Sequence, residues 1–252
     1  MQVGLIGAGN MASAFARGWG DPLLVTDVDF ARAEALAAEL GGEAVASNAE
    51  LARRADVVFL CHKPYQLDEV AAEVAGTDAA IVSILGGVPL EALQGAYPGQ
   101  QVFRLMPNVN VEVSRGVIVL AEPEDADRDL LDRLLGLLGR VGTVVRLPDR
   151  LIDAATAAMG VGPAYTALYV EAQVDAIVRL GIPADVASEL VTATVGGTIE
   201  LLAARDNDTL AVRRSVTSPA GSTARGLAAL ERHGLRTAFD AAADAVVHGG
   251  RS

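Results

Sequence analysis

One stretch near the N-terminus decides the fold of this chain: VGLIGAGNMA, residues 3–12. The apolar run over residues 3–6 predicts a short buried strand, and the glycines that follow it predict a tight turn into a helix. Gly7 and Gly9 let the backbone come close to a pyrophosphate, and the helix offers unpaired N–H groups at its N-terminus. The stretch is therefore typical of a dinucleotide-binding strand, turn and helix.

An acidic residue follows at the distance that such a turn requires. Residues 23–26 predict a second strand that ends at Asp27, 20 residues after Gly7. A carboxylate there accepts hydrogen bonds from the adenosine ribose hydroxyls, whereas a 2′-phosphate would meet a like charge, with Arg32 the nearest downstream base. A glycine-rich turn without a cofactor is the alternative. The combination of strand, turn, helix, strand and acid favours a bound NADH or NADPH, with NADH preferred because of Asp27.

Strands and helices continue to alternate beyond this unit. Further strands are expected over residues 44–46, 57–61, 81–84, 102–105, 117–121 and 144–147, and helices over 30–40, 51–55, 67–74 and 130–138. Such alternation predicts a parallel, doubly wound sheet of the Rossmann type, with ligands at the carboxyl ends of the strands. The loops at Asn10, 62–64, 86–87 and 106–108 follow strands, so we expect them all at that edge.

Past Pro148 the pattern changes to helices alone. Helices are expected over residues 164–180, 184–204 and 237–247, several of them apolar on more than one face. In a water-soluble protein that much apolar helix surface needs a partner to cover it. We therefore expect two domains, a dinucleotide-binding domain over residues 1–150 and an all-α dimerisation domain over residues 151–252.

Composition restricts the class of protein. Of the 252 residues 51% are hydrophobic and 21% charged, which is a globular composition. The net charge of −12 argues against nucleic acid and anionic membranes as partners. The single Cys61 excludes an intrachain disulfide framework and, among apolar neighbours, suggests a buried thiol. Met1 leads into a strand without a basic secretory leader, and the uncharged run 154–170 is interrupted by Gly and Pro, so we expect a cytoplasmic protein.

A second unusual stretch is SVTSPAGST, residues 215–223, inside the helical half. Its hydroxyl residues and Pro219 cannot continue a regular helix, because they compete for backbone hydrogen bonds or remove an N–H. Ser222 or Thr223 can act as the N-cap of a following helix, whose N-terminus suits a small carboxylate. An ordinary interhelical turn is the alternative interpretation.

Five motifs together resemble the pyrroline-5-carboxylate reductase family over nearly the whole chain. They are GAGNMA at 7–12, HKP at 62–64, RLMPN at 104–108, GPAY at 162–165 and VTSPAGST at 216–223. The resemblance implies the reduction of the cyclic imine 1-pyrroline-5-carboxylate to L-proline by NAD(P)H, the last step of proline biosynthesis. It also implies that the helical domain binds the substrate and forms a homodimer, or a higher homo-oligomer.

The resemblance assigns roles to individual residues. Ser222 and Thr223 would hold the substrate, with the Thr223 hydroxyl directed toward the ring nitrogen and the backbone N–H groups from Gly221 onward on the carboxylate. In the family this loop belongs to the partner subunit. The expected cofactor-binding residues are Gly7, Gly9, Asn10, Met11, Asp27, Asn48, Lys63, Pro64, Met106, Pro107 and Asn108.

The chemistry agrees with this assignment. A protonated imine needs a hydride donor but no separate acid, and His62, His233 and His248 are scattered along the chain and interpreted as solvated or structural. No spacing of His, Cys, Asp and Glu suggests a metal site.

The chain departs from the family pattern at Val161, Arg214, Ala220 and Asp27. Ala220 stands where Gly is usual, and Asp27 stands where enzymes that use NADPH more often place a small hydroxyl residue or Arg. These departures keep two alternatives open. One is a related imine or oxo-acid reductase with a different substrate, and the other is a non-catalytic NAD(P)-binding regulatory paralogue.

Overall fold

The computed structural model describes residues 1–249, which form two compact units, one over Met1–Pro163 and one that begins at Ala164. The first unit extends beyond Arg150 because the segment after β8 packs back onto the sheet. Buried Arg104 donates hydrogen bonds to Asp149 at 2.8 Å and to Asp153 at 3.3 Å, and so holds this segment in place. The functional boundary near Arg150 stays a prediction from the sequence.

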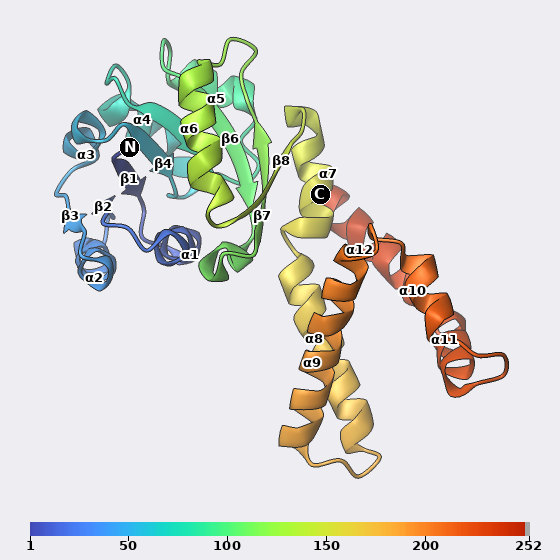
Figure 1. The fold of residues 1–252 in the computed structure, drawn as a ribbon. Helices are drawn as coiled ribbons and strands as arrows, with labels where there is room; N and C mark the ends of the chain where they lie inside the picture. The colour runs from blue at the N-terminus through green and yellow to red at the C-terminus, as the bar shows by residue number, and fades with distance from the viewer. Residues whose placement is uncertain (250–252) are drawn as a thin grey trace. The chain divides into compact units, whose positions relative to one another are not determined.

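An eight-stranded sheet forms the centre of the first unit, with the strand order β3-β2-β1-β4-β5-β6-β7-β8 (Figure 1). Its strands are β1 (Val3–Ile6), β2 (Leu24–Thr26), β3 (Glu43–Ala44), β4 (Val57–Leu60), β5 (Ala80–Ser83), β6 (Val102–Pro107), β7 (Gly116–Ala121) and β8 (Gly142–Arg146). The neighbours from β3 to β6 are parallel, as predicted. The strand order reverses between β1 and β4, and such a reversal places a ligand at the carboxyl end of β1.

The prediction of a parallel sheet is wrong at one pair, because β7 runs antiparallel to β6 and only then does β8 run parallel to β7. The link between β6 and β7 is short and is occupied by the 3₁₀ helix η2 (Val109–Val113). A parallel neighbour would need a crossover of a dozen residues or more. The short link returns the chain directly, so the sheet is mostly parallel.

Helices cover both faces of this sheet. They are α1 (Asn10–Trp19), α2 (Phe30–Leu40), α3 (Asn48–Arg54), α4 (Leu67–Val74), α5 (Leu90–Ala96), α6 (Arg128–Gly139) and α7 (Ile152–Met159), with the 3₁₀ turns η1 (Pro64–Gln66) and η3 (Asp149–Leu151). One core cluster joins α1, α2 and α6 to the sheet, and a second joins α3, α4, α5 and α7 to it. The doubly wound arrangement is confirmed, although the sequence did not predict the short helices α5 and α7.

Aromatic packing fixes the helix that follows the glycine turn. The ring of Phe15 stacks on Trp19 with centroids 4.9 Å apart, and Trp19 meets Phe59 of β4 edge-on at 5.2 Å. The Trp19 indole N–H donates to the carbonyl of Leu137 at 3.1 Å, which satisfies its polar atom. Buried aromatic groups in such geometry stabilise a core beyond the area they remove from water. The packing therefore holds the N-terminus of α1 at a fixed place above the sheet.

The second unit is all helical, as predicted, and comprises α8 (Gly162–Val178), α9 (Ala184–Ala203), α10 (Thr209–Ser215), α11 (Ser222–Arg232) and α12 (Leu235–His248). In α8 no residue is buried, and in α9 only Ala187 and Val191 are. By length and composition α9 could cross a membrane. Its most apolar 18-residue stretch has a mean hydropathy of 1.3, and 11% of that stretch is buried. This unit thus presents apolar helix surface that its own residues do not cover.

Candidate cofactor and substrate sites

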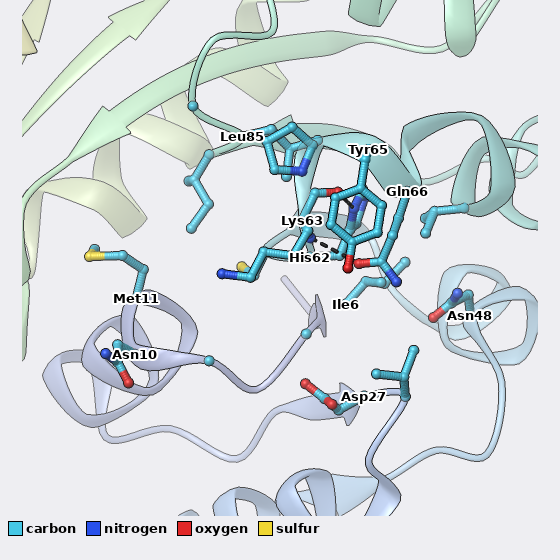
Figure 2. A pocket seen from close by; sticks show the side chains of 18 of the residues that line it. Ile6, Asn10, Met11, Asp27, Asn48, His62, Lys63, Tyr65, Gln66 and Leu85 are labelled. Atoms are coloured by element: carbon cyan, nitrogen blue, oxygen red, sulfur yellow. Dashed lines mark hydrogen bonds between the residues drawn. The ribbon is translucent and has the colours of Figure 1, made fainter. Parts of the chain in front are cut away.

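A cavity of about 600 Å³ lies at the carboxyl ends of β1, β2, β4 and β5 (Figure 2). This is the edge at which doubly wound sheets bind their ligands. Figure 2 shows Asn10 and Met11 at one end of the cavity and Asn48 at the other, with Asp27 between them. The predicted cofactor residues that line it are Gly7, Gly9, Asn10, Met11, Asp27, Asn48, Lys63 and Pro64.

The two glycines of the turn have different tasks. Gly7 has a φ of 106°, and a Cβ on it would lie 2.8 Å from the backbone carbonyl of Cys61. A side chain there would therefore break the turn. Gly9 has an ordinary extended backbone as the N-cap of α1, and a Cβ on it would meet only the guanidinium of Arg32, at 4.0 Å. The space beside Gly9 fits the close approach of a pyrophosphate to the N-terminus of α1.

Asp27 is held in place by the backbone of the turn. Its Oδ2 accepts a hydrogen bond from the N–H of Ala8 at 2.6 Å, and its Oδ1 accepts one from the N–H of Asp29 at 2.9 Å. Each carboxylate oxygen has a further lone pair, so the group can still accept from ribose hydroxyls. Asp27 therefore both fixes the glycine turn and lines the cavity with a negative charge.

The loop after β4 forms another wall of the cavity. The N–H of Lys63 donates to Oε1 of Gln66 at 3.0 Å, and Pro64 begins the 3₁₀ turn η1, so the exposed Lys63 side chain starts from a fixed backbone. The His62 Nδ1 lies 2.9 Å from the Lys63 carbonyl, while burial lowers the pKa of His62. Burial also raises the pKa of the Cys61 thiol. His62 is therefore kept neutral and Cys61 is kept as a thiol, unsuited to act as a nucleophile.

Three predicted cofactor residues do not line this cavity, namely Met106, Pro107 and Asn108. Asn108 is buried and uses both ends of its side chain. Its Nδ2 donates to the carbonyl of Met159 at 3.0 Å, and its Oδ1 accepts from the N–H of Val117 at 3.0 Å. In the first unit Asn108 thus ties the end of β6 to β7 and α7, and the cofactor role of these three residues stays a prediction.

The hydroxyl-rich stretch of the second unit runs from the end of α10 into α11. The predicted N-cap is wrong by one residue, because α11 begins at Ser222 and Gly221 is the N-cap. A Cβ on Gly221 would lie 2.3 Å from Oγ of Ser218 and 3.1 Å from its carbonyl oxygen, so a side chain there would require Ser218 to move. Ser222, exposed, and Thr223, half-buried, then occupy the first helical turn. Their N–H groups lack intrahelical partners, and the helix end favours a carboxylate.

The residue before the cap, Ala220, adopts a left-handed conformation with a φ of 58°. A residue with a side chain pays a free-energy penalty of about 1 kcal/mol in that region, which glycine avoids. The guanidinium of Arg225 donates to the Ala220 carbonyl at 2.7 Å and so holds the strained peptide from within α11. The shape of the turn is therefore supported by a contact within its own unit.

Two family models match the two halves of the chain. Residues 2–87 match the model described as NADP oxidoreductase coenzyme F420-dependent, and residues 149–252 match pyrroline-5-carboxylate reductase dimerisation. Together with the cavity and the glycine turn, these matches define the class: an NAD(P)-dependent oxidoreductase with a helical dimerisation domain.

Full-length relatives narrow this class to one family. The pyrroline-5-carboxylate reductase of Synechocystis sp. is 35% identical, with 95% of this chain and 93% of that protein covered. The corresponding enzyme of Methanosarcina acetivorans is 32% identical, with 94% and 92% covered. The structure of 1-pyrroline-5-carboxylate reductase from Streptococcus pyogenes is 28% identical, with a TM-score of 0.91 and 100% and 98% covered. The chain belongs to the pyrroline-5-carboxylate reductase family, which confirms the resemblance in its motifs.

Proposed function

We propose that this chain reduces 1-pyrroline-5-carboxylate to L-proline with NADH as the preferred hydride donor. The observation that carries the proposal is a family relationship that spans 95% of the chain. It is supported by a cavity that presents a glycine turn, an acidic residue and a free helix N-terminus to a dinucleotide.

The residues of the chain fit the reaction without a dedicated acid. When bound, the nicotinamide supplies a hydride to the carbon of the protonated C=N bond, and the nitrogen keeps its proton as the amine forms. We infer that the N–H groups of Ser222 and Thr223 bind the substrate carboxylate at the start of α11. Because the protonated nitrogen has no lone pair, the Thr223 hydroxyl accepts a hydrogen bond from its N–H and so orients the ring.

Cofactor preference follows from Asp27. Its carboxylate can bond both ribose hydroxyls of NADH, whereas the 2′-phosphate of NADPH would meet a like charge at the same place. Because the rim of the cavity is open to solvent, screening reduces this penalty. We expect NADH to be preferred by about tenfold, or roughly 1.4 kcal/mol. A relative from Plasmodium falciparum, 24% identical with a TM-score of 0.89 over 100% of this chain and 97% of that one, was solved with NADP bound.

The working unit is proposed to be a cytoplasmic homodimer in which each active site takes the loop at Ser222 and Thr223 from the partner subunit. The dimerisation domain and the exposed apolar surface of α8 and α9 support this. Gly9 and Asp27 would hold the cofactor in one subunit. A higher oligomer built from such dimers would leave the site unchanged.

One assay tests the reaction: the loss of NADH absorbance with 1-pyrroline-5-carboxylate as substrate. Steady turnover that produces proline is the expected result. Tight NADH binding without turnover of this imine or any other would indicate a non-catalytic paralogue instead. Turnover only of other imines or oxo acids would assign the chain to a related reductase, for which Val161 and Ala220 are the first residues to exchange.

A further inference from the structure

The side chain of Arg32 reaches the nucleotide cavity although it starts from the first turn of α2. Its Nη2 donates a hydrogen bond to the carbonyl of Ala8, in the middle of the glycine turn, at 3.2 Å. The same nitrogen lies 4.0 Å from where a Cβ on Gly9 would stand. The guanidinium therefore borders the space that Gly9 leaves open for a ligand.

Arg32 and Asp27 hold opposite ends of one residue. The Asp27 carboxylate accepts from the N–H of Ala8, and the Arg32 guanidinium donates to the carbonyl of Ala8. Since both contacts are made to the backbone of Ala8, the carboxylate and the guanidinium lie no more than about 10 Å apart. Yet among residues 1–249 no ion pair joins them. The backbone of the turn keeps a cation and an anion apart at the place where the adenosine ribose is expected.

Arg32 has no carboxylate partner among the described residues, unlike half of the ten other arginines of this unit. Five others form ion pairs within the described chain: Arg17, Arg54, Arg104, Arg140 and Arg146. Of the five donors on a guanidinium, Arg32 uses one side-chain donor for Ala8. In a chain with a net charge of −12, this leaves a cation with free donors beside the cavity.

We propose that Arg32 is a second determinant of cofactor selectivity that acts against Asp27, by binding the 2′-phosphate of NADPH. The proposal rests on the cofactor site of the proposed function. A 2′-hydroxyl finds its partner in Asp27, and a 2′-phosphate finds its partner in Arg32, whose planar fork can bind two phosphate oxygens. The preference for NADH then stays small because two opposed charges flank one position.

Direct binding of two nucleotides tests the proposal without any imine. Adenosine 2′,5′-bisphosphate carries the 2′-phosphate, and adenosine 5′-monophosphate lacks it but is otherwise alike. We expect Arg32→Ala to weaken calorimetric binding of the bisphosphate about tenfold and that of the monophosphate less than about twofold, since a charge-assisted hydrogen bond is lost only with the former. Arg32→Lys should retain part of the difference, because it keeps the charge.

The matched control is Arg133→Ala, which removes an exposed helical arginine at the opposite edge of the sheet, where it lines a different cavity. It should change neither binding constant. If Arg32→Ala weakens both nucleotides equally, Arg32 acts on the glycine turn or on the 5′-phosphate that both share, and the proposal is overturned. Unchanged binding of the bisphosphate also overturns it. Nucleotide binding does not require turnover, so failure of the reductase assay would leave this result interpretable.

Discussion

The two units of this chain differ in how far they bury their apolar side chains. In the first unit two clusters pack on the two faces of the sheet, and residues such as Phe15 and Phe59 are fully buried. In the second unit, of the described large apolar side chains, Leu168 is 64% exposed, Leu190 52% and Ile199 60%. A folded unit rarely leaves so much apolar surface open to water. The first unit thus buries its apolar core within one chain, whereas the second exposes apolar surface that the proposed dimer would cover.

The two parts of the proposed active site differ in the same way, because one lies in the unit with a buried core and the other in the unit with exposed helices. The nucleotide cavity lies within the first unit and is bounded by fixed backbone at Gly7, Asp27 and Lys63. The substrate loop lies in the second unit, on helices that have little buried surface of their own. Cofactor binding should therefore survive changes that separate the subunits, whereas catalysis should not.

The largest effect is expected from charging the exposed face of α9. Leu190→Glu would bury an unpaired carboxylate in the proposed dimer interface, which costs at least about 3 kcal/mol. We expect a monomer by light scattering, activity reduced by about a hundredfold or more, and NADH affinity almost unchanged. Val113→Glu is the matched control, since Val113 is 70% exposed in the first unit. A fully active monomer would contradict the comparison between the units.

The next effect concerns the loop itself. Thr223→Ala removes one hydrogen bond to the charged substrate, worth roughly 1.5–3 kcal/mol, so kcat/KM for the imine should fall about ten- to hundredfold. The affinity for NADH should stay unchanged because the cavity lies in the other unit. Thr209→Ala, which removes an exposed hydroxyl from the same unit, should have no such effect. Unaltered steady-state kinetics of Thr223→Ala would remove this residue from the site.

A smaller effect is expected within the first unit. Asp27→Ser removes the charge that opposes a 2′-phosphate, so the roughly tenfold preference for NADH should shrink or reverse. The KM for the imine should change little. Asp29→Ser is the matched control. It makes the same change of charge, and the Asp29 carboxylate makes no capping hydrogen bond at α2. The measurement is kcat/KM for each cofactor, and a wild-type enzyme that prefers NADPH would refute the role given to Asp27.

The smallest effect is a pH dependence of stability. Burial lowers the pKa of His62 below its usual 6.5, so the folded chain favours the neutral ring. The stabilising contribution is fully present above pH 6.5 and is lost as the pH falls through the lowered pKa of the folded state. His62→Val should therefore show a smaller fall in Tm between pH 7 and pH 5 than the wild type. An identical fall in both proteins would show that His62 does not control it.

How far the sequence predicts this structure depends on the range of the interactions involved. The strand, turn and helix at Gly7 and the acid at Asp27 depend on neighbours in the chain, and both elements lie where the pattern placed them. The strand β7 was predicted over residues 117–121, but its antiparallel direction was not, because apolar runs do not specify strand direction. Local periodicity also cannot show that Asn108 turns both side-chain ends inward. The reach of Arg32 depends on the rotamer of a long side chain, which no sequence pattern gives.

The helical half shows a second limit of sequence patterns. Helices that are apolar on more than one face indicated that a partner must cover them. In the structure α8 and α9 do leave most of their apolar residues exposed to solvent. The N-cap was misplaced by one residue because Ser is a stronger cap by propensity than Gly. Here Gly221 has extended backbone angles and Ser222 is the first helical residue, so the helix begins directly after the glycine.

The most direct test of the account asks whether one subunit's cavity works with its partner's loop. Gly9→Asp places a carboxylate where the pyrophosphate should bind, at a residue with ordinary backbone angles and no contact closer than 4.0 Å, so the fold should tolerate it. Thr223→Ala damages the loop alone. When the two impaired variants are mixed in equal amounts, dissociated and reassociated, half of the dimers should be mixed.

Each mixed dimer would hold one undamaged site, made from the cavity of the Thr223→Ala subunit and the loop of the Gly9→Asp subunit. We therefore expect the mixture to recover about a quarter of the wild-type activity per chain, because half of the dimers regain one of their two sites. If cavity and loop of the same chain formed each site, every site would carry one defect. Activity no higher than the average of the separate variants would then contradict the account.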